Sequence, residues 1–597
     1  MDASLNLVRP PSSHQPRLPA PAYEGAQWLS ARLPTYSAPW MSSPRPRYLW
    51  LVRGGHDSAA ASIATYAAGK PFVVHTRPLF FLCDVHADAD ALVASLVASG
   101  GVRKCGRDVH AFELTAAGRR GAFVVGGDCF DKGPSTLRLL RALRHLIDLG
   151  ADVSLLAGNH DVRTYLGLLH IGSQSARSAH LFVRMGKKTV PLLREVHDAY
   201  PRHESASAVS EAEMERRLFP SEDWFQSFDE SAREYLSSAA IAKEKRRIAE
   251  KVGEFKQACV DHGLSFRAAH NAAQRARALF CEPDGEFSWV FSRMSLAQRW
   301  GSALLVHAGV DDVTARGLRE GGIERLNSQF RHLLHADPFA LYHGPLGNMF
   351  RTKYREHEPA LTEAGVRSLH AAGIYAIIHG HKNLQRGQRV MLREGMLNFE
   401  CDCSVDSGTR DLEQLPGAGA AVTIVRPDGL VMGISADCAH AKVFDLAKYF
   451  VTVTAASQEL ATNGPRGRGA TGVRHPPKNE VAMHDDHVTT TSAGQPEPTT
   501  DKLKFRSKLG RHEVASYLHA VAAGIENGSL SFHRDAETVV LEPDDELSLE
   551  VKANSKSDKS KIEFELTWRS RDRAARSLEI SSANVTPPEA ESEPSDD

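Results

Sequence analysis

The stretch AFVVGGDCFDKG at residues 122–133 joins a short apolar run to a loop with three glycines, two aspartates and a lysine. An apolar run of this length that ends in glycine is typical of a buried strand, and the polar residues then fall on the loop that follows it. Asp128 and Asp131 are therefore predicted to lie at the end of a strand, where α/β proteins collect their ligands.

The same order of apolar run, polar loop and helix repeats on both sides of this stretch. Buried strands that alternate with helices predict an α/β fold whose sheet is covered on both faces. The expected helices span residues 91–99 and 135–149. The expected strands span residues 79–82, 122–125, 153–156, 302–306, 374–378, 397–400 and 420–425.

At 597 residues, the chain is long enough for more than one domain. Composition divides it further, because Pro- and Ser-rich or Gly-, Thr- and His-rich stretches without periodicity predict disorder or linkers. We expect a disordered segment at 1–47, a catalytic domain at 48–445, a flexible linker at 454–500, a small α+β domain at 501–569 and an acidic tail at 570–597.

Residues from about 165 to 300 break the strand–helix order and form a predicted helical insertion. They are charged and Ala-rich, with helical periodicity over 230–258 and 266–279. One interpretation is a solvated group of helices. The other is a cap that shapes substrate entry, since long insertions beside a site often act as lids.

The overall composition excludes several classes of partner. The chain carries 72 basic and 73 acidic residues, which gives no signal for nucleic acid or an anionic membrane. No apolar run approaches the roughly 20 residues of a membrane span, and the N-terminus lacks the pattern of a secretory signal. The 8 cysteines are sparse and read as reduced thiols. We therefore expect a cytoplasmic protein.

Two short motifs offer carboxylate and imidazole groups. Asp84-Val85-His86 follows the first strand, and in an extended chain this spacing aims Asp84 and His86 to the same side. Taken alone, such a pair is more often a capping aspartate and a surface histidine. Asp128 could bridge two cations, because a shared carboxylate suits the roughly 3.5–4 Å separation of two-metal sites.

Gly158-Asn159-His160-Asp161 follows the third strand. The amide oxygen of Asn159 is a ligand that hard divalent ions accept. His160, held next to that ligand, suits a proton donor for a leaving oxygen. Either Asp131 or Asp161 could pair with its other ring nitrogen and fix the tautomer.

Two further histidines end apolar runs in the second half of the catalytic domain. His307 lies in LLVHAG at 304–309, and His381 ends IIHGH at 377–381. A lone buried histidine is usually a hydrogen-bonded core residue, but two in this order are better interpreted as imidazole ligands. His379 is either a residue that supports a ligand or a structural one.

Taken together, D-x-H, G-D-x-x-D-K-G, G-N-H-D, H-A-G and G-H resemble the calcineurin-like metallophosphoesterases, over roughly residues 75–435 without the insertion. The pattern is most similar to the branch of serine/threonine protein phosphatases and diadenosine tetraphosphatases. The resemblance implies a β-sandwich flanked by helices, with two divalent ions (Mn, Fe or Zn). It implies that Asp84 and His86 hold the first ion, Asp128 bridges, and Asn159, His307 and His381 hold the second.

The resemblance also implies how the site would work. A hydroxide that bridges the metals would attack phosphorus, with His160 and Asp131 as the acid pair. Lys132 stands where the protein phosphatases have a phosphate-clamping arginine, and it offers a point charge instead of a planar fork. The expected activity is that of a phosphomonoesterase similar to a protein phosphatase, acting on a phosphorylated protein or small molecule. The alternatives are a hydrolase of dinucleotide polyphosphates or other nucleotides, a phosphodiesterase, and a non-catalytic binding protein.

Residues 501–569 resemble the small amphi-Trp domain. The resemblance rests on Lys504-Phe505, a helix expected from Arg511 to Gly524, and alternating strands at 538–542, 546–551 and 562–568 that end at Trp568. One interpretation is a packing module with Trp568 in its own core. The other is an exposed aromatic face that binds a protein partner.

Overall fold

The structure is a computed structural model of the chain. It describes residues 18–19, 21–40, 55–201, 209–355, 358–454, 521, 525, 530–534, 537–541, 547–555 and 560–567. The chain divides into two compact units, Met1–Gly469 and Ala470–Asp597. Among the residues that the structure describes, no helix is both long and apolar enough to cross a bilayer.

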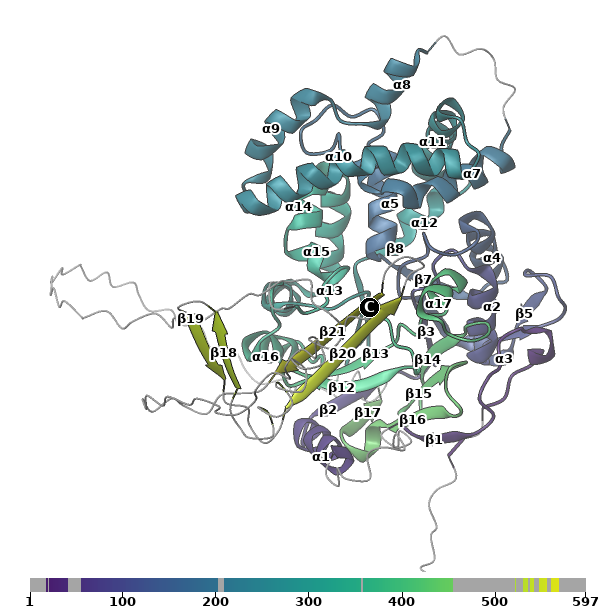
Figure 1. Cartoon of the computed structure of the whole chain (residues 1–597). Helices are drawn as coiled ribbons and strands as arrows, with labels where there is room; N and C mark the ends of the chain where they lie inside the picture. The colour runs from purple at the N-terminus through teal and green to yellow at the C-terminus, as the bar shows by residue number, and fades with distance from the viewer. Residues whose placement is uncertain are drawn as a thin grey trace, which may run out of the picture. The chain divides into compact units, whose positions relative to one another are not determined.

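Two sheets organise the first unit (Figure 1). The larger has the strand order β1-β16-β15-β14-β3-β6-β7-β8, and the smaller has the order β12-β13-β11-β10-β9. The strands of the larger sheet are β1 Ser37–Pro39, β3 Leu79–Leu82, β6 Ala122–Val125, β7 Asp152–Leu156, β8 Met294–Ser295, β14 Ala421–Val425, β15 Leu430–Ser435 and β16 Ala441–Asp445. Those of the smaller sheet are β9 Ala297–Trp300, β10 Ala303–Val306, β11 Ala376–His379, β12 Arg389–Arg393 and β13 Met396–Glu400.

Alternating side chains show that the two sheets pack face to face. Phe81 of β3 belongs to the same buried cluster as Leu305 of β10 and Ile378 of β11. Its neighbour Phe80 belongs to the other cluster, which includes Leu92 of α2. Because successive residues of a strand point to opposite faces, one face of each sheet fills the sandwich and the other packs against helices. This arrangement confirms the predicted α/β sandwich flanked by helices.

The helices of the sandwich follow the strand ends, and α2 and α4 lie beside the larger sheet (Figure 1). Helix α4 begins where the Ser135 hydroxyl accepts a hydrogen bond from the Arg138 backbone N–H, as an N-cap does. These helices are α1 Gly55–Ala67, α2 Ala89–Ala98, α3 Ala116–Arg120, α4 Thr136–Asp148, α5 Asn159–Leu169, α13 Asp312–Ala336, α14 Pro338–His343, α15 Pro345–Met349, α16 Glu363–Ala371 and α17 Ser407–Glu413.

Short elements complete the first unit. β2 Pro71–Val74 pairs in parallel with β17 Val451–Thr454, and β4 Val102–Lys104 pairs with β5 Phe112–Leu114. Two 3-10 turns, η1 Ala26–Trp28 and η3 Leu446–Lys448, lie near the two ends of this unit's described chain.

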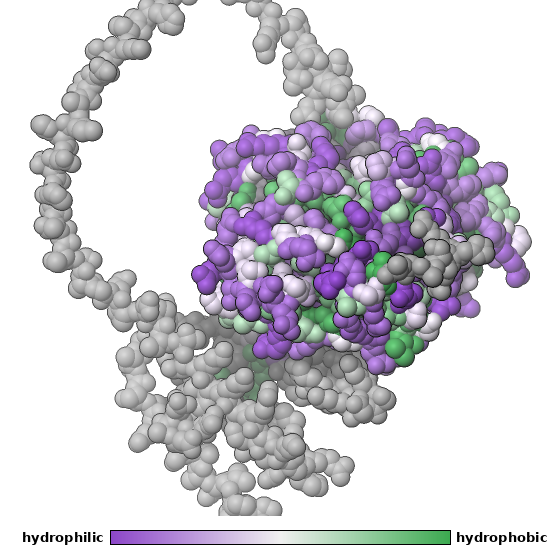
Figure 2. Space-filling view, turned by 90° about the horizontal axis from the view of Figure 1, so that it is seen from above, coloured by the Kyte–Doolittle hydropathy of each residue, from purple (hydrophilic) through white to green (hydrophobic). Residues whose placement is uncertain are grey.

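The insertion between β7 and β8 is helical, and its outer face is mostly hydrophilic (Figure 2). The helical periodicity expected over residues 230–258 is interrupted between α9 and α10, at residues 233–237. Ser237 caps a new helix there by accepting a hydrogen bond from the Ala240 backbone N–H. The elements are α6 Leu181–Arg184, η2 Gly186–Thr189, α7 Val190–Ala199, α8 Glu211–Leu218, α9 Glu222–Ala232, α10 Ser238–Asp261, α11 Phe266–Cys281 and α12 Ser288–Arg293.

The expectation that residues 1–47 are disordered is wrong for residues 21–40. Strand β1 pairs in parallel with β16, with Ser37 opposite Ala441. Trp40 is buried and packs edge-on against Phe399, with ring centroids 5.5 Å apart. The Pro- and Ser-rich composition of this segment predicted disorder because it averages over all residues. Burial of the single large side chain of Trp40 can still hold the segment in place.

The second unit contains two antiparallel pairs, β18 Leu530–Arg534 with β19 Glu537–Leu541 and β20 Ser548–Ser555 with β21 Ser560–Thr567. The three strands expected in this region correspond to β19, β20 and β21 within a few residues, and β18 was not expected. The expected helix from Arg511, Trp568, the linker after residue 454 and the acidic tail lie outside the described residues.

Candidate metal centre

The predicted donors follow strands that run in the same direction. In the larger sheet, β3 pairs in parallel with β6 and β6 with β7, so Asp84, Asp128 and Asn159 leave the sheet at one edge. In the smaller sheet, β10 pairs in parallel with β11, which brings the loops of His307 and His381 together. Carboxyl ends of parallel strands share an edge, and this topology gathers donors that are far apart in sequence.

Asp128 lies at the centre of the site. Its Oδ2 is 3.5 Å from Nε2 of His307, 3.8 Å from Nε2 of His86 and 3.9 Å from Nε2 of His160. Two groups of possible ligands share this carboxylate: His86 and His160 form one with Asp128, and His307 and His381 form the other. A carboxylate common to two groups is the arrangement that a pair of cations requires.

The remaining two predicted ligands adjoin these groups. The Oδ1 of Asn159 is 3.3 Å from Nε2 of His307. The Oδ2 of Asp84 accepts a hydrogen bond from the His381 backbone N–H at 3.0 Å. The structure therefore brings all six predicted ligands together, and this set of oxygen and imidazole donors fits divalent metal ions.

Backbone carbonyls fix which ring nitrogens face the site. Nδ1 of His86 lies 3.0 Å from the Phe130 carbonyl, and Nδ1 of His307 lies 2.8 Å from the Gly126 carbonyl. Nε2 of His381 lies 3.1 Å from the Arg351 carbonyl. Because a carbonyl only accepts, each of these nitrogens carries the proton, and the other nitrogen of each ring presents a lone pair that can bind a metal. On His86 this lone pair lies 2.7 Å from Nζ of Lys132.

Burial sets the charge of the donors. It lowers the pKa of His86 and of His381 well below the ordinary histidine value, so both rings are neutral and able to bind metal. Burial, together with the charge of Asp128, raises the pKa of Asp84 to about 8. Burial also favours the protonated form of Asp128, but the histidines around it, His307 foremost, outweigh burial and hold its pKa below the ordinary range.

Asp161 organises the loops around the site. Its carboxylate accepts hydrogen bonds from the backbone N–H groups of Asp128 and Cys129, each at 2.7 Å, and from Gly158 at 2.9 Å. It therefore ties the loop after β6 to the start of α5. Of the two carboxylates considered as partners of His160, it is Asp131 that makes the contact, with its Oδ2 2.9 Å from Nδ1 of His160.

Strained backbone gathers at the same loops. Asp128 and His86 have φ values of 58° and 39°, in the left-handed region that non-glycine residues rarely adopt. Such conformations persist where the surrounding structure enforces them, and they cluster at functional sites. Among the described residues, Asp84, His86, Ala87, Asp128, Asp131, Lys132 and His381 share this conformation around the candidate site.

His379 is buried outside the two ligand groups. Its Nδ1 lies 3.0 Å from the Gly380 carbonyl, and its Nε2 has no hydrogen-bond partner within the described residues. Burial lowers its pKa to about 4, so the ring is neutral. Among the described residues, its ring is hydrogen-bonded only to the carbonyl of Gly380, which favours the structural role over support of a ligand.

Three cationic residues adjoin the site that the sequence motifs did not identify. Arg163 reaches Oδ2 of Asp131 at 3.1 Å, and Lys188 reaches the same oxygen at 3.7 Å. Arg351, whose carbonyl orients His381, places its guanidinium 5.4 Å from the centre of the Tyr342 ring. Of these three residues, only Arg163 could have been identified from the sequence, because a residue three positions after His160 lies on the same face of a helix.

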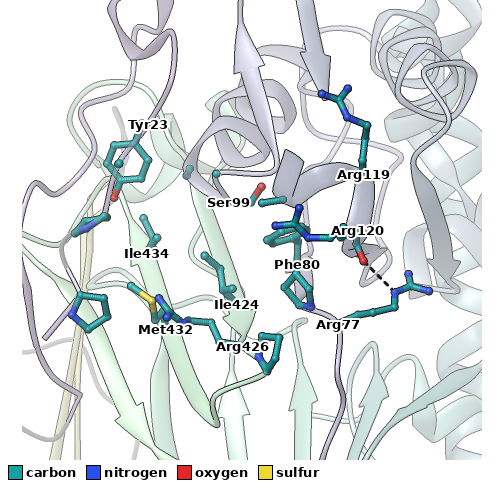
Figure 3. Close-up of a pocket in the computed structure, with 18 of the residues that line it drawn as sticks. Tyr23, Arg77, Phe80, Ser99, Arg119, Arg120, Ile424, Arg426, Met432 and Ile434 are labelled. Carbon is teal, nitrogen blue, oxygen red and sulfur yellow. Dashed lines mark hydrogen bonds between the residues drawn. The ribbon is translucent and has the colours of Figure 1, made fainter. Parts of the chain in front are cut away.

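Two cavities differ in their relation to this chemistry. One of about 320 Å³ is lined by Asp131, Lys132, Arg163 and Lys188, beside the candidate site. A larger one of about 850 Å³ lies at the opposite edge of the sheet, where β3, β6 and β7 begin (Figure 3). The larger cavity contains none of the predicted donors, so we place the functional site at the smaller one.

Comparisons with known proteins give one family match. Residues 496–581 match the Amphi-Trp domain, in agreement with the resemblance seen at 501–569. The comparison with curated proteins finds no match for this chain.

The chain is also similar to several solved phosphatase structures. A cold-active protein tyrosine phosphatase is 16% identical and covers 64% of this chain and 82% of its own, with a TM-score of 0.34. The cold-active protein-tyrosine phosphatase of a psychrophile Shewanella species is 14% identical, covers 70% and 93%, and has a TM-score of 0.32. A protein serine/threonine phosphatase from Saccharomyces cerevisiae, with similarity to human phosphatase PP5, is 11% identical, covers 65% and 89%, and has a TM-score of 0.29. With TM-scores below 0.5, these similarities carry no argument about the function of this chain.

Proposed function

We propose that this chain is a phosphoester hydrolase that depends on two divalent metal ions, most similar in activity to a phosphomonoesterase or protein phosphatase. The observation that carries the proposal is the position of Asp128, whose carboxylate is common to two groups of buried ligands. Asp84 and His86 would hold one ion, and Asn159, His307 and His381 the other. Bound there, two divalent ions would neutralise charge on phosphoryl oxygens and lower the pKa of water.

His160 and Asp131 are proposed to deliver a proton to the leaving oxygen. Nδ1 of His160 is 2.9 Å from Asp131, which leaves Nε2 directed into the site. A carboxylate behind an imidazole orients the ring and stabilises its protonated form. Arg163 holds Asp131 in place through a contact of 3.1 Å.

Lys132 is proposed to hold phosphoryl oxygens by charge. Its Nζ lies 2.7 Å from Nε2 of His86, so the ammonium already sits at the edge of the metal centre. Lysine contacts a phosphate as a point charge, without the paired hydrogen bonds of an arginine. A substrate phosphate would therefore be oriented mainly by groups other than Lys132.

The Amphi-Trp domain is proposed to bind a protein partner rather than to act in the chemistry. Leu549 of β20 is 60% exposed, so a partner could reach an apolar side chain on this small sheet. Deleting residues 501–569 should then leave hydrolysis of small substrates unchanged and abolish recruitment of that partner.

The decisive experiment combines metal analysis with a substrate panel. Metal-stripped protein is refilled with Mn, Fe or Zn, and its metal content is measured. It is then assayed on p-nitrophenyl phosphate, bis-p-nitrophenyl phosphate and a dinucleoside tetraphosphate. We expect activity only after refilling, with the monoester hydrolysed faster than the diester. Preference for the dinucleotide or for the diester would instead support the nucleotide hydrolase or the phosphodiesterase.

A matched pair of variants tests the bridging carboxylate. Loss of a residue that merely supports a ligand costs about 10–100-fold in metal affinity or activity, so Asp128→Asn should cost at least about 100-fold in kcat. Asp152→Asn is the control, because Asp152 is exposed and paired with Arg77 at the opposite edge of the sheet. Full metal-dependent activity in Asp128→Asn would refute the proposal.

A further inference from the structure

The cavity of about 320 Å³ lies between the catalytic loops and the insertion. Lys132 and Arg163 reach it from the core, and Lys188 reaches it from η2 of the insertion. Three side chains that carry positive charge therefore converge beside the metal centre. An anion is the natural ligand of such a cavity.

The carboxylates that line this cavity are already engaged. Glu195 caps the start of α4, where the Ser135 hydroxyl and the Leu137 backbone N–H donate to it. Asp131 is shared by His160, Arg163 and Lys188. Within the described residues, the positive charge of this cavity therefore exceeds the negative charge that faces it.

Two further basic residues, Lys251 and Arg184, lie near Arg163. Lys251 of α10 donates to the Arg184 carbonyl, and burial, with Arg163 and Arg184 nearby, lowers its pKa to about 8. Arg184 pairs with Glu244 at 2.8 Å. Each buried cation without a full counter-charge is costly, and a bound anion would reduce that cost for all of them.

Lys132 connects this cavity with the metal centre, where the reacting phosphate would bind. Its Nζ contacts His86 of the metal centre at 2.7 Å, and the same side chain lines the cavity. An anion in the cavity would thus lie within one lysine side chain of the phosphoryl group. A second phosphate carried by the same substrate can therefore reach the cavity.

We infer that this cavity holds a second phosphate group, so that the preferred substrate carries at least two phosphates linked by an anhydride oxygen. The inference rests on the proposed function, and it makes Lys188 and Arg163 determinants of specificity. Water adds to the terminal phosphorus and releases one proton to solvent, and the bond from that phosphorus to the bridging oxygen breaks. The bridging oxygen keeps the electron pair and takes a proton from His160. The products are orthophosphate and a chain shorter by one phosphate.

The test compares inorganic tripolyphosphate with p-nitrophenyl phosphate, using the full chain with the same metal. For Lys188→Gln, we expect the ratio of kcat/KM for tripolyphosphate to that for p-nitrophenyl phosphate to fall at least tenfold, mainly through KM. Lys187→Gln is the matched control. It removes the same charge from the same turn at an exposed residue outside the cavity, and it should keep the wild-type ratio.

A binding measurement separates this inference from the proposed function. In the Asp128→Asn background, tripolyphosphate binding is measured by calorimetry with and without Lys188→Gln. Weaker binding after Lys188→Gln supports the cavity even if the chain hydrolyses neither substrate, which would refute the proposed function alone. An unchanged specificity ratio together with unchanged binding would overturn the inference. A dependence on Lys188 for an acidic phosphopeptide but not for tripolyphosphate would overturn it as well.

Discussion

The loops that leave the two sheets and the helices of the insertion contribute to one site in different ways. The loops supply six potential ligands, each one to four residues after a buried strand, and four of them have left-handed backbone: Asp84, His86, Asp128 and His381. The insertion supplies Lys188 from a short 3-10 turn with ordinary geometry. The proposed metal ligands therefore lie at the rigid ends of strands. The positive charge proposed to select a substrate comes from the insertion, whose sequence could change without disturbing those ligands.

The largest effect should come from the loops, with His160→Asn. If His160 donates the proton to the leaving oxygen, kcat for an alkyl phosphate should fall about 10²–10⁴-fold. The loss should be much smaller for p-nitrophenyl phosphate, because its phenolate leaves without a proton. Steady-state kinetics on the two substrates check this. Equal losses on both substrates would mean that His160 binds a metal ion and does not donate the proton to the leaving oxygen.

The next effect should come from the insertion and should concern stability. Glu244 pairs with Arg184, and their side chains are only 11% and 16% exposed. Glu244→Gln leaves Arg184 near Arg163 and Lys251, so the free energy of unfolding should fall by up to about 3 kcal/mol. Glu254→Gln, at an exposed residue of the same helix, is the control. Metal content should stay unchanged in both; a loss of metal in Glu244→Gln would show that the two regions are not independent.

Asp161→Asn should act on the loops without removing a ligand. Its carboxylate accepts three backbone hydrogen bonds that hold Asp128 and the start of α5, and an amide offers a single acceptor oxygen. Metal affinity should fall about 10–100-fold, as measured by competition with a chelator. Wild-type affinity in this variant would mean that the loops hold their shape without Asp161.

The smallest effect should be a pH dependence in the insertion. The pKa of Lys251 is lowered from 10.5 to about 8, so between these values the unfolded chain binds more protons than the folded one. This group therefore makes the fold more stable as pH rises through that window, by less than about 1.4 kcal/mol per pH unit. Urea unfolding at about pH 8 and pH 10 should show this rise in wild type, and Lys251→Gln should show less of it. An equal rise in the variant would contradict the shift.

The sequence predicted the parts of the site that depend on local order. Asp84, Asp128 and Asn159 could be identified because each follows a buried strand, and parallel strands bring such positions together. The role of Asp161 could not, since it depends on backbone N–H groups some thirty residues away. Lys188 and Arg351 were missed for the same reason, because only the tertiary fold places them beside the motifs.

The helices and strands also divide into those that local sequence predicts and those that depend on distant residues. The apolar pattern predicted seven strands of the two sheets to within about two residues, as with β3 and β6, and missed β1, β8, β9, β12, β15 and β16. The break between α9 and α10 was missed because Ser237 interrupts a helical pattern without changing its composition. The order of residues 21–40 was missed because Trp40 and the pairing of β1 with β16 depend on residues near the far end of the unit.

The parallel pairing of β1 with β16 has a consequence for how the protein is made. Ser37 meets a partner that follows it by about four hundred positions, so during synthesis the early segment must wait for most of the chain to leave the ribosome. Until then residues 37–39 have no strand to pair with, and an unpaired strand edge invites association with other chains. Removal of residues 1–40 would instead leave the edge of β16 permanently open, and such a protein should accumulate in inclusion bodies despite an intact set of catalytic groups.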